Sequence, residues 1–195
     1  MSTVYKTIQI GHSNIEAIKE LLHNFKRQHD KEYEIIQSKI DNIVNGLFKF
    51  NKPITLISST RISFITMIAD DKELNLEMAG YISSHLSCVC IYAEFYDFEF
   101  YNVQIFSSGD CLITVRKDSS DNKSLILSGD NKGIEKQYDN WIEGIEKALE
   151  IDDLSDSFCA FEYVFNAFLT TSMKSFDNRE INELRSVGCE LHFIE

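Results

Sequence analysis

The chain contains very little proline and glycine. Among its 195 residues there is a single proline, Pro53, and there are eight glycines. Because these residues concentrate in turns and linkers, their scarcity argues against long structureless segments. Hydrophobic residues make up 44% of the chain and aromatic residues 12%, which is enough for a sizeable core and excludes a chain that is disordered throughout. We therefore expect one folded domain over residues 1–195.

Basic side chains are also scarce. Nineteen Lys and Arg stand against 31 Asp and Glu, which gives a formal net charge of −12. A surface this negative repels phosphate backbones and anionic lipid headgroups, so binding to nucleic acid or to a membrane is not expected, whereas a basic protein partner is compatible with it. The sequence has neither a signal peptide nor an apolar run long enough to span a bilayer. These absences predict a cytoplasmic protein of undetermined oligomeric state.

The cysteines do not fit a disulfide framework. Their odd number and apolar surroundings favour reduced, mostly buried thiols at five positions, Cys88, Cys90, Cys111, Cys159 and Cys189. Cys88 and Cys90 fall on the same face of a predicted strand, which could begin a metal site. Their spacing, however, is not the Cys-x-x-Cys of a zinc site. We expect no metal and no cofactor.

One stretch, from Cys88 to Arg116, carries the clearest structural signal: CVCIYAEFYDFEFYNVQIFSSGDCLITVR. It is dominated by β-branched and aromatic residues and predicts adjacent strands of an antiparallel sheet. A turn at Ser107–Asp110 closes two of them, with Gly109 supplying a positive φ and Asp110 tolerating the neighbouring position. Alternation places Val89, Ile91, Ala93 and Phe95 on one face of the first strand and places on the other face Cys90, Tyr92, Glu94 and Tyr96.

Apolar spacing predicts the remaining elements. Strands are expected at residues 3–10, 54–69 and 189–194, the second interrupted by a turn or bulge at Ser58–Arg61. A helical part is expected at about 13–50, capped by Ser13, either as one helix or as a hairpin bent near Asp30. Further helices are expected at about 74–86, 134–149 and 154–171. The segment 117–132 is the best loop candidate, with a short strand possible at 124–127.

Together these elements predict the fold class α+β. We expect a mostly antiparallel sheet with helices packed on one face, and a sheet and helix core over about 54–195.

The sequence holds no recognisable catalytic pattern. No histidine lies in a nucleophile signature, and the glycines of Ser128–Gly133 do not match a phosphate-binding loop. Three carboxylates, Glu94, Asp97 and Glu99, lie along the central strands. A pair of them could act as acid and base on a sugar, and the alternative is a solvated strand face.

The most organised charged feature follows Gly133. Four acids of the predicted helix recur at spacings that place them on one side, and three more continue the negative charge beyond it: Asp139, Glu143, Glu146, Glu150, Asp152, Asp153 and Asp156. Like charges at this spacing repel, and acids near the carboxyl end of a helix oppose its dipole. This side is either a solvated face or a docking surface for a basic partner.

The layout of residues from about Asp70 to Met173 adds a resemblance. A capped helix precedes the strand YAEFYDFEFYNVQIF, the turn SSGD and a charged loop, and then come an acidic helix with Trp141 and the aromatic helix FCAFEYVFNAFL. In this layout the chain resembles a group of bacterial immunity proteins that neutralise polymorphic toxins. The resemblance implies a small, acidic, non-enzymatic binding protein of the cytosol that blocks one toxin, and it implies no catalytic residues.

The sequence thus predicts an inhibitor that occludes a basic toxin domain, for example a nuclease. The expected contacts are the carboxylates of Glu94, Asp97 and Glu99 and those of the acidic helix. A scaffold or regulatory interaction domain is the first alternative, and a hydrolase using Glu94, Asp97 and Glu99 is the second.

Overall fold

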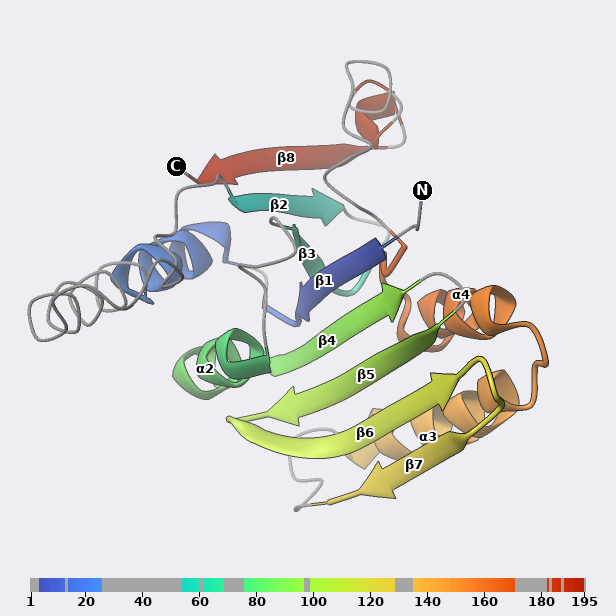
Figure 1. The fold of residues 1–195 in the computed structure, drawn as a ribbon. Helices are drawn as coiled ribbons and strands as arrows, with labels where there is room; N and C mark the ends of the chain where they lie inside the picture. The colour runs from blue at the N-terminus through green and yellow to red at the C-terminus, as the bar shows by residue number, and fades with distance from the viewer. Residues whose placement is uncertain are drawn as a thin grey trace, which may run out of the picture.

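The computed structural model describes residues 4–12, 14–25, 54–59, 62–68, 76–96, 99–128, 135–170, 182, 184–186 and 188–194. Within them, one antiparallel sheet has the strand order β7-β6-β5-β4-β1-β3-β2-β8 (Figure 1). The strands are β1 (Val4–Ile10), β2 (Ile54–Ser59), β3 (Ile65–Ile68), β4 (Val89–Tyr96), β5 (Phe100–Ser107), β6 (Asp110–Asp118), β7 (Lys123–Leu127) and β8 (Cys189–Ile194). The helices are α2 (Leu76–Leu86), α3 (Glu135–Leu149), α4 (Leu154–Phe165) and an N-terminal helix at residues 15–25.

The α+β class and the antiparallel sheet are confirmed. One face of β4 presents Ile91, Ala93 and Phe95 to a core that includes α3 and α4, which Figure 1 shows behind the strands. Its other face presents Cys90 and Tyr92 to a second core beneath α2 and the N-terminal helix. The expectation of helices on one face therefore holds for α3 and α4 only. A second pair covers the other face, because β4 is apolar on both sides at its N-terminal end.

The hairpin between β5 and β6 forms where the sequence predicted it. Gly109 has φ +94° and Ser108 has φ +52°. A tight two-residue turn of this kind needs positive φ at both central positions. Ser108 therefore takes the other left-handed position of the turn, next to Gly109. The sequence predicted Asp110 at this position, but Asp110 begins β6.

Two further segments differ in detail from their predictions. The Asn14 carboxamide Oδ1 accepts the N–H of Ala17 at 3.1 Å, so Asn14 caps the N-terminal helix, while Ser13 lies outside the described residues. The segment predicted as a loop contains the end of β6, which runs to Asp118, and the strand β7 at Lys123–Leu127, where the sequence allowed a short strand. The Asp118 carboxylate closes the turn between them by accepting the N–H groups of Ser120 and Asn122. The predicted bend near Asp30 lies outside the described residues.

A buried lysine joins the sheet to the end of α3. Lys117 of β6 is 2% exposed, and its Nζ donates to the backbone carbonyls of Leu149 and Ile151. Lys123 of β7 donates to the same Leu149 carbonyl at 3.1 Å. The last carbonyls of a helix have no partner within the helix and carry partial negative charge. Lys117 and Lys123 therefore satisfy free carbonyls at the carboxyl end of α3. This is the end at which the acidic residues of α3 oppose the helix dipole.

Helix α4 is shorter than predicted. The Asp153 carboxylate caps its start by accepting the N–H of Asp156 at 2.9 Å, and Asn166 ends it in the left-handed conformation with φ +51°. The chain then turns back, and Glu162 Oε1 accepts the N–H groups of Leu169 and Thr170 at 2.7 and 2.8 Å. These contacts end the helix at Phe165 and not near residue 171.

We predict that Gly144 is required for the close packing of α3 on α4. A Cβ at Gly144 would lie 2.9 Å from Cγ1 of Val164, whereas a Cβ at Gly80 of α2 would meet Phe106 at an ordinary 3.7 Å. Gly144→Ala should lower the free energy of unfolding by about 1–3 kcal/mol through overpacking. Gly80→Ala should raise it by up to about 1 kcal/mol through helix propensity.

Denaturant unfolding of the two variants measures the difference. Adding Val164→Ala to Gly144→Ala should recover part of the loss by making room for the new methyl group. Equal effects of the two glycine substitutions would show that the helices do not approach as closely as described.

Candidate functional site

The outer side of α3 and the start of α4 form an acidic layer. We use this name for the exposed carboxylates of Asp139, Glu143, Glu146, Glu150, Asp152, Asp153 and Asp156. From residue 138 to residue 170 the chain has eight carboxylates and a single cation, Lys147. The opposite side of α3 is apolar, since Trp141, Ile145 and Leu149 are buried. The predicted division of this helix into an inward and an acidic side is therefore present.

Part of the acidic layer has local partners. Glu143 pairs with Lys147 one turn later, and the hydrogen bond from this lysine lowers the pKa of the Glu143 carboxyl. Glu150 lies 3.8 Å from Lys123, and Asp153 caps α4. The two ion pairs, being at an exposed surface, contribute little to stability. The remaining members form no ion pair with any residue that the structure describes: Asp139, Glu146, Asp152 and Asp156.

An exposed aromatic side chain stands beside this layer. Tyr163 of α4 is 89% exposed, the highest value of any large hydrophobic side chain described. Its neighbour Val164 contacts α3 at Gly144, which places Tyr163 next to the crossing of the two helices. The sequence prediction missed it because aromatic residues crowd this segment. Helical phase separates them, since Phe158, Phe161 and Phe165 face the core and Tyr163 falls on the other side.

Glu94 has a different environment from the acidic layer. Its two carboxylate oxygens accept hydrogen bonds from the Tyr92 hydroxyl at 2.8 Å and the Asn102 amide at 3.1 Å, and Lys6 lies 3.8 Å away. Burial, together with the negative charge of Glu94, raises the pKa of Tyr92, so its phenol stays a donor. The Glu94 side chain is 16% exposed. Its oxygens are thus used within the sheet, as in a satisfied polar network.

Glu94 does not join the acidic layer. It shares a face of β4 with Cys90 and Tyr92, which is the face of α2, whereas α3 and α4 cover the other. Glu99 is exposed in the turn before β5, where its backbone carbonyl accepts the N–H of Ser119 at 2.8 Å. Asp97 lies outside the described residues. Among the predicted strand acids, Glu94 is therefore on the face of the sheet opposite to α3 and α4.

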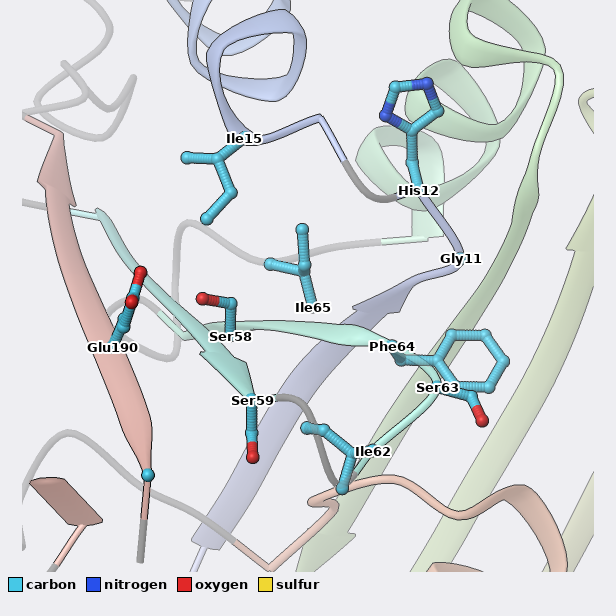
Figure 2. A pocket seen from close by; sticks show the side chains of 11 residues that line it. Gly11, His12, Ile15, Ser58, Ser59, Ile62, Ser63, Phe64, Ile65 and Glu190 are labelled. Atoms are coloured by element: carbon cyan, nitrogen blue, oxygen red, sulfur yellow. The ribbon is translucent and has the colours of Figure 1, made fainter. Parts of the chain in front are cut away.

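A cavity of about 540 Å³ lies near the ends of β1, β2 and β8 (Figure 2). Its polar lining includes Ser58, Ser59, Ser63, His12 and Glu190. Figure 2 shows His12 and Glu190 on opposite sides of this space. His12 Nδ1 accepts the N–H of Asn14 at 3.2 Å and is thereby occupied in a local turn. Nucleophilic catalysis needs a base within hydrogen-bond reach of a hydroxyl or thiol, and these residues do not present that arrangement.

Two other features bear on ligands. Over the described part of the chain, no group of three or more His, Cys, Asp or Glu side chains is arranged to hold a metal ion. All five cysteines are free thiols, and those of Cys88 and Cys90 lie 3.9 Å apart. None of the helices described here has both the length and the apolar character to cross a membrane.

Comparison with known proteins returned no match: no family model fits the chain, and neither a curated protein nor a solved structure is significantly similar to it.

We predict that Glu94 stabilises the fold and that Glu146 of the acidic layer does not. Glu94→Gln replaces one acceptor by an amide donor, which then faces either the Tyr92 hydroxyl or the Asn102 amide. A lost hydrogen bond at a site this buried should lower the free energy of unfolding by about 1–3 kcal/mol. The matched change Glu146→Gln, on the exposed side of α3, should alter it by less than about 0.5 kcal/mol. Urea denaturation of both variants tests this, and equal losses would contradict it.

Proposed function

We propose that this chain is a non-enzymatic binding protein that covers a basic protein partner with the acidic layer and Tyr163. The observation that carries the proposal is the gathering of exposed carboxylates and one exposed aromatic ring on the outer side of α3 and α4. These two helices and the segment between them hold the seven exposed carboxylates of the acidic layer, four of which form no ion pair with a described residue, and Tyr163. Binding energy at protein interfaces concentrates in a few aromatic or arginine anchors surrounded by polar groups.

The charge arrangement suits a partner rich in lysine and arginine. The electrostatic field of a surface with almost only negative charges steers a positively charged protein toward it and raises the association rate, most strongly at low salt. An arginine of the partner can stack on the ring of Tyr163 while neighbouring cations pair with carboxylates. Apart from Asp153, which caps α4, the fold does not need these acids, because its helices would be more stable with mixed charges.

The resemblance to immunity proteins leads us to propose that the partner is a bacterial toxin domain, occluded by direct contact. A scaffold or regulatory domain would use the same surface with a different partner. A hydrolase based on Glu94, Asp97 and Glu99 receives less support, since both Glu94 oxygens accept hydrogen bonds within the sheet.

The first experiment is affinity capture of the partner from the native cell, with the whole chain as bait. The net charge of the captured partner, and the activity that the partner loses on binding, then identify the class of protein to which it belongs. Recovery of a basic toxin encoded beside this protein would support the immunity proposal. A partner that is acidic, or that binds equally well after the changes below, would overturn the proposed surface.

We predict that charge reversal on the acidic layer weakens binding to the captured partner. The variant Asp139→Lys, Glu146→Lys, Asp152→Lys changes three exposed acids that form no ion pair with described residues. Since a close charge pair across an interface contributes about 1.5 kcal/mol or more, Kd should rise at least about tenfold. Association should also slow less with added salt than it does for the wild type.

A matched variant separates local contact from net charge. Glu20→Lys, Glu77→Lys, Glu190→Lys makes the same change in net charge at three exposed acids on the N-terminal helix, α2 and β8. It should reduce the association rate slightly and leave the dissociation rate unchanged. Tyr163→Ala should raise the dissociation rate without loss of stability, because the ring is 89% exposed in the free protein. Equal weakening by the two triple variants would show that only net charge matters.

A further inference from the structure

Cys88 and Cys90 form a close thiol pair at the start of β4. Their Sγ atoms lie 3.9 Å apart, within hydrogen-bond distance for sulfur. Cys88 is half-buried, whereas Cys90 is 0% exposed. One thiol therefore meets solvent, while the other is buried beside it.

The backbone of Cys88 is held by one residue of α2. The Cys88 N–H donates to the carbonyl of Ser83 at 3.2 Å, and the Ser83 hydroxyl donates to the Cys88 carbonyl at 2.7 Å. Ser83 is itself 0% exposed and accepts the N–H of Gly109 at 3.2 Å, which ties it to the β5–β6 turn. The position of Cys88 relative to Cys90 is thus set by the packing of α2 on the sheet.

The two thiols differ in acidity. The hydrogen bond with Cys90 lowers the pKa of the Cys88 thiol, while the same bond and burial raise the pKa of Cys90. The thiolate is the reactive form of cysteine, and its reactivity also requires exposure. Both conditions select Cys88 as the attacking sulfur and Cys90 as the resolving one.

We propose that Cys88 and Cys90 are a modification site at which a hydroperoxide closes an intramolecular disulfide. The Cys88 thiolate attacks one peroxide oxygen, the O–O bond breaks, and hydroxide leaves and takes up a proton, which gives a sulfenic acid. Cys90 then loses its proton and attacks the Cys88 sulfur, and the S–O bond breaks to release a second water. The two sulfurs lose two electrons in total, and hydrogen peroxide is reduced to two molecules of water.

The other cysteines lack this arrangement. The Cys111 thiol lies 3.5 Å from both Gln104 Oε1 and Thr114 Oγ1 and has no second thiol within hydrogen-bond distance. Cys189 is buried at 4% exposure. Burial and the nearby carboxylates of Glu162 and Asp156 raise the pKa of Cys159. A bridge between residues two apart closes a small, strained ring, so we expect this disulfide to be reduced readily by dithiothreitol.

The test is thiol counting by mass spectrometry on the full chain. Reduced protein, freed of reductant and treated with hydrogen peroxide, is alkylated in denaturant. Five labelled thiols should become three, with the loss of two hydrogens, and dithiothreitol should restore five. Proteolytic mapping should place the bridge between Cys88 and Cys90. A protein that keeps five labels, or loses Cys111, Cys159 or Cys189 first, would overturn the proposal.

Variants assign the roles of the two sulfurs. Cys90→Ala should accumulate the sulfenic acid of Cys88, which dimedone traps, and Cys88→Ala should form neither product at the remaining thiol. Cys111→Ser is the matched control and should behave as the wild type. If circular dichroism shows that Cys90→Ala is unfolded, the variant Ser83→Ala is used in its place, because it keeps both thiols. The rate of disulfide closure is then measured in the folded Ser83→Ala protein. Closure as fast as in wild type would then contradict the positioning by Ser83, and slower closure would support it.

Discussion

The structure depends on a strand that must be covered on both faces. β4 presents Ile91, Ala93 and Phe95 to one core and Cys90 and Tyr92 to the other. Burial of such side chains is the main favourable term in folding, so neither face of β4 can be left to water. The helices consequently divide into two layers, with α3 and α4 on one side and α2 and the N-terminal helix on the other. β1 lies beside β4 at the centre of the sheet, and this pairing joins the half formed by β4, β5, β6 and β7 to the half formed by β1, β3, β2 and β8.

The α3–α4 layer is fixed from within, which leaves its outer surface free for binding. Gly144 allows Val164 to approach α3, and Lys117 and Lys123 satisfy the carboxyl end of α3 from the sheet. Because these contacts lie on the inner side or at the end of the helix, the outer acids are not required for packing. One of these acids has a structural task, since Asp153 caps α4, and Glu162, which is not part of the acidic layer, holds the chain that follows α4.

The two proposed sites occupy opposite faces of the sheet. The acidic layer and Tyr163 belong to α3 and α4, whereas Cys88 and Cys90 pack with α2. A protein bound to the acidic layer would therefore leave the thiol pair accessible. Binding and thiol oxidation are separate proposals, and either stands without the other.

The sequence by itself determined the strands from Cys88 to Arg116, the β5–β6 turn and the two-sided character of α3. Period-two and helical periodicities are local, and they report burial directly. Tertiary structure decided the rest. It separated Glu94 from the acids of α3, because strand pairing brings Tyr92 and Asn102 to the Glu94 oxygens while the sheet lies between Glu94 and α3. It buried Lys117 in a predicted loop by bringing the end of α3 within its reach. Helical phase also sets Tyr163 apart from the buried phenylalanines of its aromatic run, so its exposure was open to sequence analysis. Tertiary structure set the Cys88 thiol against Cys90 through the hydrogen bonds of Ser83. Each of the outcomes that tertiary structure decided depends on contacts between different elements, which local spacing does not fix.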